Sequence, residues 1–117
     1  MPRRVLVVDD HLDTAHSLAI LLRDMGHEVE FAINGHAAME IARRFQPEIV
    51  FLDLLLPDFD GCEVARRLRL QQGGKNARIL AITGGGNEGL RRRAHEAGCD
   101  EYLLKPLDLK LLDALIG

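Results

Sequence analysis

The chain has 117 residues, which predicts one domain spanning residues 1–117, and its 47 % apolar and 28 % charged residues suit a buried core under a solvated surface. The formal net charge of −3 argues against direct binding of nucleic acid, because contacts to phosphate groups need a basic face. The apolar runs are too short to cross a bilayer and no signal peptide is recognisable, so we expect no membrane contact and a cytoplasmic location.

Five short β-rich runs alternate with amphipathic stretches along the chain. The second run alternates polar and apolar residues, which is typical of an edge strand with one face in water. The other four are nearly continuous apolar runs, as expected for parallel strands that helices cover on both faces. The predicted strands are, in chain order, Arg4–Val8, Glu28–Ala32, Ile49–Leu52, Arg78–Thr83 and Glu101–Leu104.

An amphipathic helix is predicted after each strand. Asn34 and Asp60 are suitable N-caps, and Gly26, Pro47 and Gly98 are typical of helix ends. Strands that alternate with helices favour a parallel sheet with right-handed crossovers, and five strands are too few for the usual eight-stranded barrel. The predicted fold class is therefore α/β, a doubly wound five-stranded parallel sheet of (βα)5 type.

Polar residues stand at the ends of four predicted strands. Asp9 and Asp10 follow the first strand, Asp53 follows the third, Thr83 ends the fourth and Lys105 follows the fifth. Ligands of open α/β sheets gather at the carboxyl ends of the strands, so we expect these side chains to converge. Three carboxylates at close range favour a hard divalent cation, and Mg²⁺ suits oxygen ligands beside a phosphate. Together with the ammonium group, this pattern indicates phosphoryl transfer onto an aspartate.

Four segments at these positions carry a resemblance to a known family. They are Val5–Asp10, Leu52–Gly61, Ala81–Gly84 and Tyr102–Pro106. In this order and at these separations they resemble the response-regulator receiver family over essentially the whole chain. The resemblance implies the flavodoxin-like receiver fold with strand order 2-1-3-4-5. It also implies a single receiver domain at residues 1–117 that acts as a phospho-acceptor signalling switch and is not an enzyme.

The resemblance also implies a role for each matching residue. Asp53 would be the phospho-acceptor. Asp10 and Asp53 would bind Mg²⁺ directly, Asp9 would bind it through water, and the backbone carbonyl of Leu55 would complete the protein ligands. Lys105 would pair with Asp53 at rest and with a phosphoryl oxygen afterwards.

A switch and a set of partners follow from the same resemblance. Thr83 and Tyr102 would form the switch pair, although Tyr102 could instead simply pack against the fourth helix. The family's cis peptide between Lys105 and Pro106 would aim the lysine into the site. The phosphodonor would be a histidine kinase or a histidine phosphotransfer protein. The surface of the fourth helix, fifth strand and fifth helix would control a downstream protein or an attached domain, or form a homodimer.

Two segments, Asp60–Leu68 and Glu96–Asp100, look most like receivers that are joined to hybrid sensor histidine kinases. We expect no output domain within these 117 residues, because the chain stops within or just after its fifth helix. The protein is therefore expected to be either a stand-alone regulator or one module of a longer protein, and both alternatives stay open.

The chain departs from the family pattern at two places near the acceptor. Leu55 stands two residues after Asp53, where many relatives have a polar side chain, and Gly85 stands two residues after Thr83, inside the run Gly84–Gly86. Neither side chain can position a hydrolytic water. Our hypothesis is that Leu55 shields the acyl phosphate and slows its hydrolysis, while the glycine run leaves its loop mobile.

Other charged residues near the site have simpler interpretations. His11 borders the pocket, and we do not expect it to act as a ligand or as a phosphodonor. Asp60 caps a helix, and Asp58 is expected to be solvated. The run Arg91–Arg93 is interpreted either as the solvated face of the fourth helix or as part of a partner contact.

Three alternative functions compete with the receiver interpretation. A phosphatase of the haloacid dehalogenase type needs a second Asp two residues after the first, and Leu55 cannot transfer a proton. A flavodoxin-like cofactor binder needs a phosphate loop after the first strand, where Asp9 and Asp10 would repel a flavin phosphate. A pseudo-receiver would only bind proteins, and phosphorylation by acetyl phosphate with Mg²⁺ would decide against it.

Overall fold

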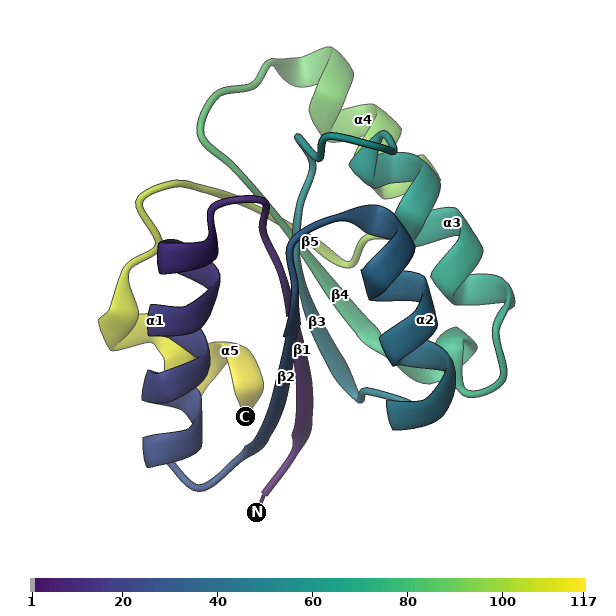
Figure 1. Cartoon of the computed structure of the whole chain (residues 1–117). Helices are drawn as coiled ribbons and strands as arrows, with labels where there is room; N and C mark the ends of the chain where they lie inside the picture. Colours follow the sequence, from purple (N-terminus) through teal and green to yellow (C-terminus); the bar gives the residue numbers. More distant parts are fainter. Residues whose placement is uncertain (1) are drawn as a thin grey trace.

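The computed structural model describes residues 2–117, which form a five-stranded parallel sheet in the order β2-β1-β3-β4-β5 (Figure 1). The predicted strand order is confirmed, and so are the strand bounds, except that the third strand also includes Asp53. The strands are β1 (Arg4–Val8), β2 (Glu28–Ala32), β3 (Ile49–Asp53), β4 (Arg78–Thr83) and β5 (Glu101–Leu104).

Helices cover both faces of the sheet, as Figure 1 shows. One face carries α1 and α5, and the other carries α2, α3 and α4. The helices are α1 (Leu12–Asp24), α2 (Gly35–Phe45), α3 (Gly61–Leu70), α4 (Glu88–Glu96) and α5 (Leu112–Ile116), with short 3₁₀ turns at Gly74–Asn76 (η1) and Leu109–Leu111 (η2). Among residues 2–117, no helix combines the length and the apolar character that a membrane span requires.

The core has two halves, one on each face of the sheet. Successive side chains of a strand point to opposite faces, so Val5 and Val7 pack with α1 and α5 while Leu6 and Val8 pack with the other three helices. This explains why the central strands are continuous apolar runs. The edge position predicted for the second strand is confirmed, since β2 pairs only with β1 in the sheet order.

The predicted helix caps are confirmed at two positions, and a third cap comes from a loop. Asn34 accepts a hydrogen bond from the Ala37 N–H, and Asp60 accepts one from the Cys62 N–H. The Asp58 carboxylate accepts hydrogen bonds from two backbone N–H groups of the first turn of α2, at 2.7 and 2.9 Å. Asp58 is exposed, as expected of a solvated acid, and it also caps α2 from the loop after β3.

Candidate functional site

The predicted polar residues meet at the carboxyl edge of the sheet. Asp9 lies just beyond the end of β1, and Asp53 is the last residue of the neighbouring strand β3. Thr83 is the last residue of β4, which pairs with β3. All three are buried: Asp9 is 5 % exposed, Asp53 is 4 % exposed and Thr83 is fully covered. Buried carboxylates need a compensating charge.

Lys105 supplies that charge to both buried carboxylates. Its Nζ donates to Asp9 Oδ2 and to Asp53 Oδ2, each at 2.9 Å. Burial by itself lowers the pKa of Lys105, but the hydrogen bonds to Asp53 and Asp9 outweigh this effect, and the net pKa is raised. The peptide bond between Lys105 and Pro106 is cis, as the family pattern implied. The ammonium group is therefore charged at neutral pH and compensates the two buried carboxylates.

Four side chains bring ligand atoms close enough together to share a metal ion. One potential ligand atom from each of Asp9, Asp10, His11 and Asp53 lies within 4.8 Å of all the others. Three of the four are carboxylates, of which Asp9 and Asp53 share the Lys105 ammonium group, and carboxylate oxygens are the ligands that a hard cation prefers. The residues present therefore fit a divalent cation at this edge.

His11 is the residue that our sequence interpretation placed only at the border of the pocket. Its backbone N–H donates to Asp9 Oδ1 at 2.9 Å, and its Nδ1 lies 3.3 Å from Asp9 and 3.2 Å from Asp10. The side chain is 71 % exposed and lies beside both acids. Its position directly after the acid pair was the only sequence signal for this contact.

The loop between β3 and α3 holds the other oxygen of Asp53. The Leu55 N–H donates to Asp53 Oδ1 at 2.9 Å, while the Leu55 side chain is 63 % exposed. Gly61 closes this loop, because its N–H donates to the Leu54 carbonyl at 3.0 Å. A metal-binding role for the Leu55 carbonyl stays a prediction.

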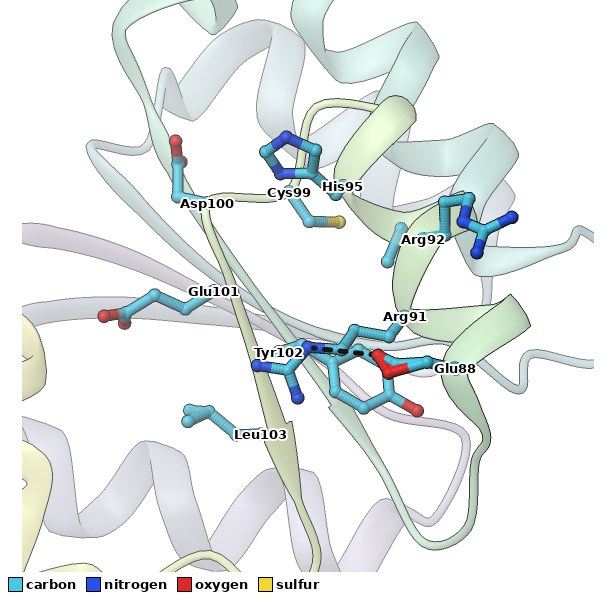
Figure 2. A pocket seen from close by; sticks show the side chains of 10 residues that line it. Glu88, Arg91, Arg92, His95, Cys99, Asp100, Glu101, Tyr102 and Leu103 are labelled. Atoms are coloured by element: carbon cyan, nitrogen blue, oxygen red, sulfur yellow. Dashed lines mark ion pairs between the residues drawn. The ribbon is translucent and has the colours of Figure 1, made fainter.

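The expected switch residues lie on the neighbouring strands β4 and β5, where Tyr102 pairs with Ala81, two residues before Thr83. The Thr83 hydroxyl donates to the Gly85 carbonyl at 2.7 Å and so does not reach Asp53. The Tyr102 hydroxyl is buried and has no hydrogen-bond partner among residues 2–117. Figure 2 shows the Tyr102 ring beneath α4, where the Arg91 guanidinium lies 5.5 Å from the ring centre. Tyr102 does pack against the core on the α4 side of the sheet, which leaves a switch role as a separate prediction.

The family follows from a comparison with known proteins. The sequence model of the family named response regulator receiver domain matches residues 5–117. The chain belongs to this family. It is a receiver domain of a response regulator, a phospho-acceptor switch, and this assignment decides against the phosphatase and the flavodoxin-like cofactor binder.

Individual relatives agree with the family assignment. Response regulator MprA of Mycolicibacterium vanbaalenii is 38 % identical over 112 residues, which cover 96 % of this chain and 48 % of that protein. The DNA-binding dual master transcriptional regulator RpaA of Synechocystis is 33 % identical over 110 residues, which cover 94 % of this chain and 45 % of that protein. The crystal structure of Vibrio cholerae chemotaxis protein CheY4 matches with a TM-score of 0.92 at 26 % identity, covering 99 % of this chain and 97 % of that one.

The chain spans about half the length of the two curated relatives, MprA and RpaA. One of them is named as DNA-binding, so the expectation that this protein binds no nucleic acid directly gains no support from them.

Proposed function

We propose that residues 1–117 form one receiver domain that accepts a phosphoryl group on Asp53 with Mg²⁺ as cofactor. The observation that carries the proposal is the buried Asp53 carboxylate, which shares the Lys105 ammonium with Asp9 at the carboxyl edge of the sheet. Asp10 and Asp53 would hold the cation directly, Asp9 through water, and the Leu55 carbonyl would complete the protein ligands. When bound, the cation neutralises charge on the transferring phosphoryl group.

The transfer itself uses an oxygen of the Asp53 carboxylate as the nucleophile. This oxygen forms a bond to phosphorus while the bond from phosphorus to a histidine nitrogen of the donor breaks, and the imidazole leaves with the electron pair of that bond. Lys105 stays in place and pairs with a phosphoryl oxygen of the product. The Leu55 N–H, already bound to Asp53, orients the carboxylate. The donor in this proposal is a histidine kinase or a histidine phosphotransfer protein in the cytoplasm.

The output in this proposal passes through Thr83 and Tyr102 to the surface of α4, β5 and α5. The Thr83 hydroxyl would leave Gly85 for the phosphoryl group, and the tyrosine would follow it. This surface would control a downstream protein or an attached domain. It also carries both charge signs, with Arg91 on α4 and Glu101 on β5, which favours pairing with a second copy through the same face (Figure 2).

A phosphorylation assay tests the proposal directly. Incubation with acetyl phosphate and Mg²⁺ should add the mass of one phosphoryl group, and Asp53→Asn should abolish the gain because an amide is not a nucleophile here. Asp58→Asn is the matched control, since this aspartate lies five residues further on and the asparagine oxygen still accepts one of the two backbone hydrogen bonds that cap α2. An unmodified wild-type protein would instead support a pseudo-receiver that only binds proteins.

Leu55→Asn is expected to shorten the lifetime of the phosphorylated protein by roughly tenfold. This effect is smaller than the rate gain of about 10²-fold or more that a positioned acid or base gives, because an amide only orients a water. In this proposal the Leu55 side chain, whose own N–H is bound to Asp53, keeps water from an ordered approach to the phosphoryl group, whereas an amide would hold a water there. The decay of labelled phosphoprotein measures the effect. Leu70→Asn, at a leucine that is 86 % exposed on α3, is the control. An unchanged lifetime in Leu55→Asn would contradict the shielding hypothesis.

A further inference from the structure

Few apolar contacts hold α4 on the sheet. Of its nine residues only Ala94 is buried, and Leu90 packs against the core with part of its side chain exposed. By comparison, α3 buries five residues at its interface with the sheet. Because apolar burial is the main source of helix attachment, other contacts must contribute to the position of α4.

An ion pair joins α4 to the loop that follows Asp53. Arg93, from the middle of α4, donates through Nη2 to Asp60 Oδ2. The other oxygen of Asp60 accepts the Cys62 N–H at 2.8 Å and so caps α3. Burial raises the pKa of Asp60, but the hydrogen bonds from Cys62 and Arg93 outweigh it and the net pKa is lowered, so the carboxylate is charged at neutral pH.

The neighbouring turn of α4 covers the tyrosine. Arg91 lies over the Tyr102 ring, and its Nε lies 3.9 Å from a carboxylate oxygen of Glu88 (Figure 2). At Gly86, just before the helix, an added Cβ would overlap the Tyr102 hydroxyl. The tyrosine is therefore enclosed by α4 and by the loop that precedes it, and its exposure depends on where α4 sits.

We infer that the Asp60–Arg93 pair is a latch that holds α4 against the β3–α3 loop and thereby keeps Tyr102 covered. Arg93 is then a positioning residue, because it acts on Tyr102 through α4. The latch connects the phosphorylation loop to α4 by a route separate from Thr83. It goes beyond the proposed phosphorylation and does not require it.

The test measures α4 in the unphosphorylated protein, without a phosphodonor or a divalent cation, so failure of the latch and failure of the proposed phosphorylation are distinguishable. Arg93→Gln and Asp60→Asn each remove the pair, and the asparagine retains the cap of α3. Amide hydrogen exchange within α4 should become about two- to fivefold faster in both variants, the range for a partly exposed ion pair. The double variant should exchange no faster than either single one.

A second measurement reports on the tyrosine. The chain has one tyrosine and no tryptophan, so intrinsic fluorescence comes from Tyr102. Quenching of the Tyr102 fluorescence by acrylamide should rise in Arg93→Gln and return toward the wild-type value in Arg93→Lys. High salt weakens the ion pair, so it should raise the quenching in the wild type. The difference in quenching between the wild type and Arg93→Gln should then become smaller. Arg92→Gln is the matched control, because this adjacent arginine makes no ion pair within the described chain.

Three outcomes would overturn the latch. One is unchanged exchange and quenching in both Arg93→Gln and Asp60→Asn. Another is an equal effect of Arg92→Gln, which would reflect net charge alone. The third is acceleration of exchange in β1 and β3 to the same extent as in α4, which would mean global destabilisation.

Discussion

Lys105→Met is expected to lower the free energy of unfolding at pH 7 by about 3–5 kcal/mol in buffer free of divalent cations, the cost of leaving a buried charge without its partner. The ammonium group lies 2.9 Å from a carboxylate oxygen of both Asp9 and Asp53, whose side chains are only 7 % and 5 % exposed. Methionine keeps the length of the side chain but not the charge. Two buried carboxylates then repel each other without a compensating charge.

Mg²⁺ should restore a large part of this stability, because a divalent cation at the three carboxylates replaces the missing charge. Urea denaturation followed by circular dichroism, with and without Mg²⁺, measures both effects. Lys110→Met changes an exposed lysine of η2 and should leave the unfolding free energy unchanged. An equal loss for Lys105→Met with and without Mg²⁺ would contradict the predicted metal site.

The pH dependence of the Lys105 contribution has a defined sign. The folded-state pKa of Lys105 is raised above its ordinary value, so the folded protein holds this proton more tightly than the unfolded chain does. The stabilisation is therefore fully present below about pH 10, where the unfolded lysine is charged, and is lost as the pH rises through the folded-state pKa. The wild type should accordingly lose its advantage over Lys105→Met as the buffer is made alkaline, which urea denaturation of both proteins at increasing pH measures.

Gly61→Ala is expected to cost about 3 kcal/mol of stability, at the upper part of the usual range for overpacking. An added Cβ would overlap the Cα of Leu54 and lie 2.9 Å from the Asp53 carbonyl oxygen. These are backbone atoms, which cannot turn aside as a flexible side chain can. The loop after β3 would have to move, and with it the Leu55 N–H that holds Asp53. Phosphorylation by acetyl phosphate should slow for this reason.

Gly84→Ala is the matched control for this substitution. Gly84 lies at the same edge of the sheet, after Thr83, and an added Cβ there meets no atom within 4 Å. The unfolding free energy of the Gly84→Ala variant should stay within about 0.5 kcal/mol of the wild-type value, as for most surface substitutions. Equal losses in Gly61→Ala and Gly84→Ala would show that the close approach to Leu54 is not the cause.

The strands and the acid cluster were predictable from the sequence alone. Apolar runs bounded by polar residues located all five strands, and only Asp53 was added to the end of one of them. The convergence of Asp9 and Asp53 followed because parallel strands end at one edge of the sheet, whatever the loops between them do. Local caps such as Asn34 were likewise predictable, since the contacting groups are three residues apart.

Contacts that depend on the direction of a loop were decided only by the tertiary structure. Asp58 reaches the first turn of α2 although 23 residues separate it from Gly35. Asp60 meets Arg93 across 33 residues, which turned an arginine interpreted as a solvated or partner-contacting residue into part of an ion pair. No periodic pattern encodes where a loop side chain points, because its partners are set by how the helices pack on the sheet. The pattern of apolar runs therefore specifies the sheet and the acids at its edge, while the packing of helices on the sheet specifies what those acids and their loops contact.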